Sequence, residues 1–229
     1  MLGDANVAAV AALVGDSTRA TMLDVLMDGG AHPVGELARL AGVAASTASE
    51  HLARLRDGGL VVREVVGRES RYRLASAEAA EALEALARVA APTSVRTLRE
   101  ANKGDALRLA RTCYDHLAGR LGVGITEALV LRRALVLRDG SFEVTPVGER
   151  LLYEHGGDVA AARGRQRSFA RSCLDWSERR PHLAGALGAA LAEALVANCW
   201  LRRRMHDRGL IVTELGRTAL RRELGVRLT

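Results

Sequence analysis

Apolar residues recur at helical spacing in the first part of the chain. The pattern predicts a helix over residues 13–30, in which Ala20, Leu23, Leu26 and Met27 share one face. Asp16 and Ser17 are suitable N-caps, and the run Asp28-Gly29-Gly30 is a typical stop. A short helix is predicted over 34–41, followed by a turn at Gly42.

A longer helix is predicted over residues 45–57, closed by Gly58-Gly59. Ala48, Leu52 and Leu55 lie on one face of it, while small polar residues occupy its N-terminal end. A short helix, a tight turn and a second helix form a helix-turn-helix pattern.

Two β-prone runs follow, over 60–66 and 70–74, around the polar tip Gly67-Arg68-Glu69. They predict a two-stranded wing. A helix over about 77–90, rich in Ala, Glu and Leu, ends before Pro92 and carries an apolar stripe suited to a partner helix.

The order of the strings LGDSTRATML, GELARLAGVAASTASEHLARLRDGGLV and REVVGRESRYRL resembles the winged helix-turn-helix of the ArsR/SmtB family of bacterial repressors, over roughly residues 5–91. The resemblance implies a DNA-binding domain over 1–91 that acts as a homodimeric repressor on double-stranded DNA with an inverted-repeat operator. The leading hypothesis is a cytoplasmic protein.

In such a domain the helix over 45–57 enters the major groove and the wing lies over the adjacent backbone. The residues expected at DNA are Ser46, Thr47, Ser49, Glu50, His51 and Arg54 on the helix, with Arg68 and Arg71 on the wing. The family's helix usually reads close to SQSTVSRHL, and here Ala45 and Glu50 replace its Gln and Arg. Glu50 either accepts a hydrogen bond from cytosine or pairs with a neighbouring Arg.

Metal-sensing members of the family use Cys-x-Cys before the recognition helix, or Asp and His on the last dimer helix. This chain has GELARLAG and AEAAEALEALARVA at those places, which offer no such ligands. Any sensing is therefore expected in the remainder of the chain.

That remainder contains an internal repeat. RTCYDH at 111–116 recurs as RSCLDW at 171–176, and HLAG at 116–119 recurs at 182–185, so the second copy holds a six-residue insertion near SERRPH. VTPVGERLL and VTELGRTAL echo each other further on. We expect a connector over 92–104 and a sensor or dimer-support domain over 105–229, with repeats at about 105–157 and 165–229.

Each copy reads as helix, helix, β-hairpin, helix, and the first hairpin turns at Asp139-Gly140. The expected fold class is thus mainly α with short β-hairpins: a winged helix-turn-helix plus two tandem, degenerate winged-helix-like repeats about a pseudo-two-fold axis. The alternative is two helical hairpins with short edge ribbons.

The repeated Cys-x-Asp unit is the candidate effector site. With Cys113 and His116 expected on one helical face, the set Cys113, His116, Cys173, Asp175 and His182 could hold a metal or metalloid ion, or react with oxidants through its thiols. Alternatively both cysteines are buried core residues and the Asp residues are caps or Arg partners. A third interpretation is a small organic effector beside Tyr114 and Trp176.

Charge and composition limit the function classes. The net charge is +6, yet residues 1–91 carry −3 and residues 92–229 carry +9, so the basic excess lies outside the predicted DNA-binding domain. No apolar run is long enough to span a membrane, and three cysteines without an export signal predict free thiols in a reducing cytosol. The leading hypothesis is a transcriptional regulator and not an enzyme; the alternatives are an architectural DNA-binding protein and a Cys/His-dependent enzyme.

Overall fold

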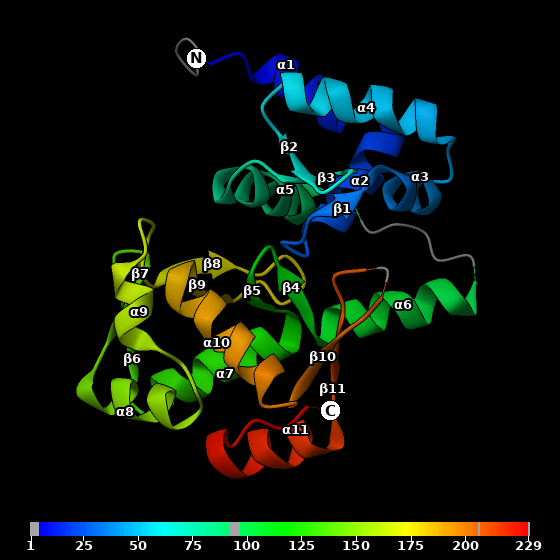
Figure 1. Cartoon of the computed structure of the whole chain (residues 1–229). Coiled ribbons are helices and arrows are strands. Elements are labelled where there is room, and N and C mark those ends of the chain that lie inside the picture. Colours follow the sequence, from blue (N-terminus) through cyan, green and yellow to red (C-terminus); the bar gives the residue numbers. More distant parts are fainter. Residues whose placement is uncertain (1–4, 92–96, 206, 229) are drawn as a thin grey trace. The chain divides into compact units, whose positions relative to one another are not determined.

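The computed structural model describes residues 5–91, 97–205 and 207–228 (Figure 1). The chain divides into two compact units: the first ends at Leu83 and also includes Asp207 and Arg208, and the second comprises the other described residues from Glu84 onward. We call them the N-terminal unit and the C-terminal unit. None of the helices in the described ranges has the length and apolarity that crossing a membrane requires.

The N-terminal unit combines helices with a three-stranded antiparallel sheet of order β1-β3-β2. Its elements are α1 (Val7–Val14), α2 (Ser17–Leu26), β1 (His32–Pro33), α3 (Val34–Ala41), α4 (Ala45–Asp57), β2 (Val61–Val66), β3 (Glu69–Leu74) and α5 (Ala77–Val89), the last of which runs across the boundary between the units. The single helix predicted over 13–30 is wrong in its bounds. Asp16 accepts a hydrogen bond from the Arg19 amide and starts α2 as its N-cap, while Gly15 ends the separate α1.

The predicted helix-turn-helix and wing are confirmed. Gly42 adopts a left-handed conformation with φ 69°, which an L side chain rarely tolerates, and so allows the sharp turn between α3 and α4. Ala48, Leu52 and Leu55 form the inner face of α4 and are fully buried, as is Leu37 of α3. This apolar seam fixes which face of α4 remains available to solvent.

His32 provides a pH-dependent contribution to the stability of the N-terminal unit. Its Nε2 lies 2.8 Å from Asp28 Oδ2 and its Nδ1 lies 3.1 Å from Glu36 Oε2. The hydrogen bond to Asp28, with the nearby charges of both carboxylates, raises the pKa of His32 to about 9 against the opposing effect of burial. A raised pKa stabilises the fold fully below the unfolded value near 6.5, and this stabilisation is lost as the pH rises through about 9.

We therefore expect His32→Gln to lower the free energy of unfolding by on the order of 1–3 kcal/mol at pH 6 and by clearly less at pH 10. Urea unfolding followed by far-UV circular dichroism measures the difference. Fluorescence of the two Trp residues, at 176 and 200, separately reports the C-terminal unit. A gap between wild type and variant that is equal at both pH values would contradict the prediction.

The C-terminal unit contains both copies of the repeat. The first copy comprises α6 (Leu98–Leu109), β4 (Arg111–Cys113), β5 (His116–Ala118), α7 (Gly119–Leu131), β6 (Leu135–Arg138), β7 (Ser141–Val144) and α8 (Pro146–Glu154). The second comprises α9 (Val159–Gly164), β8 (Arg171–Leu174), β9 (Pro181–Ala184), α10 (Gly185–Ala197), β10 (Leu201–Arg203), β11 (Leu210–Val212) and α11 (Glu214–Ala219), which continues into a π-helical turn over Leu220–Leu224.

Each copy thus runs helix, hairpin, helix, hairpin, helix, which corrects the predicted order of helix, helix, hairpin, helix. The extra hairpin, β4–β5 or β8–β9, comprises strands of only three or four residues, too short for an alternating pattern to be visible. The six inserted residues fall in the β8–β9 connection. Of the predicted connector 92–104, residues 92–96 lie outside the described residues, and the part from Leu98 onward belongs to α6.

The two copies exchange contacts reciprocally. The Phe142 amide donates to the Ala170 carbonyl at 2.7 Å, joining β7 to β8, and the Leu210 amide donates to the Ala110 carbonyl at 2.9 Å, next to an isolated bridge between Arg111 and Gly209. Likewise α7 packs on β9 while α10 packs on β5. These paired contacts are what a pseudo-two-fold arrangement produces, and one hydrophobic core extends through both copies.

Candidate functional site

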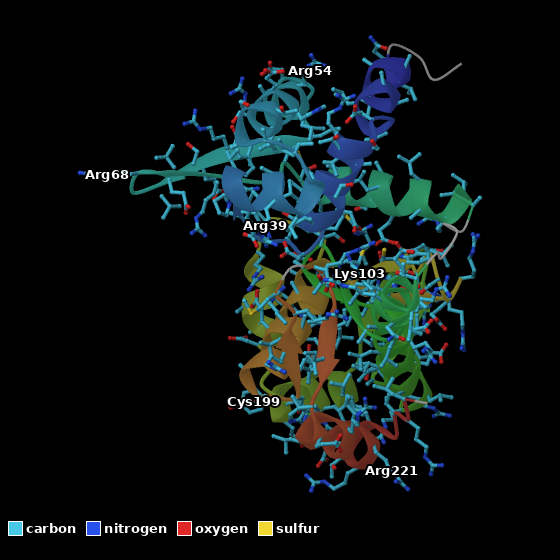
Figure 2. The ribbon with its side chains drawn as sticks, turned by 90° about the vertical axis from the view of Figure 1, so that its right-hand side faces the viewer. Arg39, Arg54, Arg68, Lys103, Cys199 and Arg221 are labelled. Atoms are coloured by element: carbon cyan, nitrogen blue, oxygen red, sulfur yellow. The ribbon has the colours of Figure 1, made fainter. Side chains whose placement is uncertain are left out.

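The face of α4 opposite its buried seam is polar. Ser46, Ser49, Glu50 and Arg54 are exposed, and Thr47 is half-buried. The helix begins after Ala44 without a side-chain cap, which leaves its first-turn amides available to an external acceptor. Figure 2 shows Arg54 projecting from this helix.

His51 is placed differently from the rest of the predicted set. Its Nδ1 lies 3.6 Å from Asp16 Oδ1 and 3.4 Å from Arg19 Nη1, so the ring is held against the start of α2. The pKa of Asp16 is lowered by the hydrogen bond that it accepts from the Arg19 amide, and by the charges of Arg19 and His51. The His51 side chain therefore helps to hold α4 against α2.

The wing presents one arginine at its tip. Arg68 is exposed between β2 and β3 and projects outward (Figure 2), and within the described residues neither Arg68 nor Arg54 takes part in an ion pair. Arg71 instead pairs with Glu69 at 2.8 Å. Arg63 donates to Ser70 and Arg73 pairs with Glu64, as expected of charges on a solvated hairpin.

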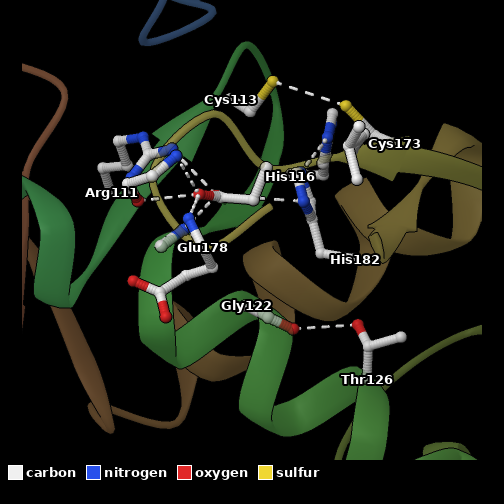
Figure 3. A network of polar contacts seen from close by, with 12 residues as sticks. Arg111, Cys113, His116, Gly122, Thr126, Cys173, Glu178 and His182 are labelled. Atoms are coloured by element: carbon white, nitrogen blue, oxygen red, sulfur yellow. Dashed lines mark hydrogen bonds and ion pairs between the residues drawn. The ribbon is translucent and has the colours of Figure 1, made fainter. Parts of the chain in front are cut away.

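In the C-terminal unit, Cys113, His116, Cys173 and His182 converge in one buried cluster (Figure 3). Their sulfur and nitrogen ligand atoms all lie within 4.8 Å of one another. The two Sγ atoms are 4.0 Å apart, and the two Nε2 atoms are 3.1 Å apart. We call these four residues the Cys2His2 cluster.

The cluster is built from two equivalent hairpins and not from a helix face. Cys113 pairs with His116 across β4–β5, and Cys173 pairs with His182 across β8–β9. The expectation that Cys113 and His116 share a helical face is therefore wrong, because both belong to short strands. Opposite residues in an antiparallel pair direct their side chains to the same side of the ribbon, which brings each Cys beside its His.

Hydrogen bonds within the cluster favour the thiolate form of Cys173. Hydrogen bonding to Cys113, and to both imidazoles, lowers the pKa of the Cys173 thiol despite its burial. Burial alone would lower the pKa of His116, but Asp115 and Cys173 outweigh it and raise that pKa. Asp115 is itself held by His116 and Arg167, and their hydrogen bonds and charges lower its pKa although burial opposes this.

Asp175 lies beside the cluster and not among its four converging atoms. Its Oδ2 accepts from Arg111 Nη2 at 2.8 Å and from the Gly119 amide at 2.7 Å. Its Oδ1 accepts from the amide and hydroxyl of Ser177 and from the Glu178 amide. Burial opposes ionisation here, but the Arg111 charge and these donors hold the pKa of Asp175 below its usual range.

Arg111 was not among the candidate site residues, and it is fully buried. Besides Asp175, its guanidinium contacts Ser177 and lies 4.8 Å from the centre of the Trp176 ring. The repeated Arg-x-Cys unit was the available signal, since Arg111 and Arg171 hold the same place in the two copies. The third cysteine, Cys199, is exposed and takes no part in the cluster.

The chain is similar in sequence to known proteins. Residues 14–64 match a family model described as a helix-turn-helix domain. The HTH-type transcriptional regulator YdfF of Bacillus subtilis is 41% identical over 97% of this chain and 99% of its own. The HTH-type transcriptional regulator CmtR of Mycobacterium tuberculosis is 45% identical over 32% of this chain and 62% of its own.

Among solved structures, a homodimeric winged helix-turn-helix DNA-binding domain from Mycobacterium bovis is 31% identical, covering 39% of this chain and 88% of that one at a TM-score of 0.33. The likeness to YdfF extends over both units. This chain accordingly belongs to the HTH-type transcriptional regulators, with a winged helix-turn-helix in its N-terminal unit and an internally duplicated C-terminal unit.

Proposed function

We propose that the protein is a homodimeric repressor that binds an inverted-repeat operator and is released when an effector binds in the C-terminal unit. The observation that carries the proposal is the solvent-facing polar surface of α4. It combines small polar residues at the N-terminal end with Arg54, about two turns further on, which forms no ion pair within the described residues.

This surface suits the major groove. The exposed Ser46 and half-buried Thr47 permit close approach to bases, and uncapped first-turn amides are good partners for phosphate. Ser49 and Glu50 extend the same surface, and Arg68 at the wing tip reaches outward toward an adjacent backbone or minor groove. Arg71 adds a second wing charge, shared with Glu69.

Exposed apolar helices support a homodimer. None of the residues of α1, with the sequence VAAVAALV, is buried, and Val7 and Val10 are exposed. Leu86 and Val89 at the end of α5 are exposed as well. Apolar helix faces of this kind are stabilised when a second copy covers them. Two copies also match the two-fold symmetry of an inverted repeat.

The proposed role is regulatory and not enzymatic. The buried Cys113 and Cys173 are confined beside two imidazoles, whereas a nucleophilic thiol needs access to substrate. An architectural role without an effector would not explain why both copies of the repeat contribute a Cys and a His to one buried polar cluster. Binding that changes the balance between two conformations of the protein is sufficient for release from DNA. We place this activity in the cytoplasm, where the operator DNA and reduced thiols are found.

Removing single arginines tests the DNA interface. We expect Arg54→Ala and Arg68→Ala each to weaken binding to the DNA upstream of the protein's own gene by about tenfold, since each removes a positive charge that the proposed interface places near phosphate. The slope of log affinity against log salt should fall by about 1 in each variant. Fluorescence anisotropy with labelled DNA over a range of salt concentrations measures both quantities.

Arg221→Ala is the matched control, because Arg221 is an exposed arginine of the C-terminal unit (Figure 2). It removes the same charge and should leave both affinity and salt slope nearly unchanged. If all three variants bind equally, the assignment of α4 and the wing to DNA fails.

A further inference from the structure

We propose that the Cys2His2 cluster is a closed, four-coordinate site for a divalent, borderline-soft metal ion of the Zn²⁺ type, and that this ion is the effector. The effector role of the ion rests on the proposed function, whereas the metal site itself rests on the geometry alone. None of its four residues belongs to segments 35–42 or 77–90, the two places at which the ArsR resemblance predicts metal ligands.

The spacing of the four atoms fits tetrahedral coordination. Metal–ligand distances of about 2.3 Å for sulfur and 2.0–2.1 Å for nitrogen place two sulfurs about 3.8 Å apart and two nitrogens about 3.3 Å apart around one ion. The observed separations are 4.0 Å for Sγ–Sγ and 3.1 Å for Nε2–Nε2. The widest separation in the cluster, up to 4.8 Å, has to contract by about 1 Å on binding.

The orientation of the imidazoles points to a cation between them. The Nδ1 of His116 faces Asp115 Oδ1 at 3.4 Å. The buried Nδ1 of His182, which has no hydrogen bond to any described residue, faces Asp175 Oδ2 at 3.9 Å. A carboxylate beside Nδ1 favours the tautomer whose proton is on that nitrogen, as in carboxylate–histidine–metal arrangements. Two Nε2 lone pairs then face each other at 3.1 Å, which is repulsive unless a proton or a metal ion lies between them.

Core packing of small cysteines does not account for this arrangement. A buried Cys that only fills space needs apolar neighbours. Here each sulfur instead lies beside the other sulfur and two imidazoles, in the middle of a core that is otherwise rich in Leu and Ala. Burying four polar side chains costs free energy unless their hydrogen-bonding and charge are satisfied, and a bound cation satisfies all four at once.

The donor set also selects the class of ion. Two thiolates and two neutral imidazoles neutralise a divalent cation and suit Zn²⁺ or its tetrahedral analogues Cd²⁺ and Co²⁺. All four ligands come from the protein and are buried, so no coordination position is left for a substrate. The ion would also link β4–β5 of one copy to β8–β9 of the other. Metal binding would therefore change how the two copies pack against each other.

Cobalt serves as the spectroscopic probe. We expect the reduced, full-length protein to bind one Co²⁺ per chain, with the visible bands of tetrahedral Co²⁺ and the near-ultraviolet absorption of thiolate coordination, and Zn²⁺ to displace it. Cys113→Ala, Cys173→Ala and His182→Gln should each weaken the metal affinity by more than about 100-fold, since second-shell changes alone cost 10–100-fold. Cys199→Ala is the matched control and should bind like wild type, because Cys199 is exposed and outside the cluster.

The possible outcomes distinguish metal binding by the Cys2His2 cluster from an effect of the metal on DNA binding. Absence of tetrahedral Co²⁺ bands in wild type, or equal affinity in the Cys113, Cys173 and Cys199 variants, overturns the metal site. Circular dichroism identifies folded variants, and the two Cys→Ala changes are small enough to keep the test valid if His182→Gln does not fold. If the metal binds as expected but Zn²⁺ leaves the affinity for operator DNA unchanged, the site stands and the proposed effector role falls.

Discussion

Replacing Arg111 by Met is expected to lower the free energy of unfolding of the C-terminal unit by about 3–5 kcal/mol. Arg111 and Asp175 are both fully buried and joined at 2.8 Å. Without the guanidinium, Asp175 would keep its amide and hydroxyl donors but lose the positive charge of Arg111 that compensates its own. A buried charge without a partner is far more costly than the absence of the whole pair. The contact with Trp176 would be lost as well.

Trp fluorescence during urea unfolding measures this effect, because both Trp residues belong to the C-terminal unit. Arg138→Met is the control: Arg138 pairs with Glu143 at 3.0 Å, but both side chains are more than half exposed. An exposed pair contributes at most about 1 kcal/mol, so this variant should unfold nearly like wild type. If the two substitutions lower the free energy of unfolding equally, the buried pair contributes no more to stability than the exposed one.

Adding a single methyl group at Gly148 or Gly216 is expected to destabilise the C-terminal unit by about 1–3 kcal/mol or more. A Cβ at Gly148 would lie 2.1 Å from the Ala134 carbonyl oxygen, and one at Gly216 would lie 2.1 Å from that of Trp200. Both obstacles are backbone atoms, which cannot turn aside as a flexible side chain can. The two glycines hold the same place in the two copies, where α8 and α11 begin after the N-caps Thr145 and Thr213.

Gly104→Ala is the opposite case. Gly104 lies within α6, where an added Cβ meets nothing within 4 Å. Ala is favoured over Gly in a helix by up to about 1 kcal/mol, so this substitution should stabilise the protein slightly. Unfolding midpoints of Gly148→Ala, Gly216→Ala and Gly104→Ala check the sign as well as the size. A stabilising effect at Gly148 would mean that α8 does not pack on the backbone as described.

The elements of the DNA-binding region could be predicted because their signals are local. Gly42 and Gly58-Gly59 delimit α4, and the spacing of Ala48, Leu52 and Leu55 identifies its buried face. In the second half, the Asp139-Gly140 turn is confirmed by the positive φ of both residues. The duplication too was evident in the repeated strings, and the mainly helical fold class with short hairpins is confirmed.

The sequence by itself therefore determined the helix-turn-helix, the wing, the family and the presence of two related copies, since each depends on residues close together in the chain or on likeness alone. Only the tertiary structure decided that Cys113 and His116 occupy a hairpin, that Asp175 pairs with Arg111, and that cysteines 60 residues apart meet. Strands as short as β4 and β8 have almost no intrinsic preference for pairing. Their structure depends on contacts with the other copy, in which β7 pairs with β8, Gly209 bridges to Arg111, and the partner strands β5 and β9 pack against α10 and α7.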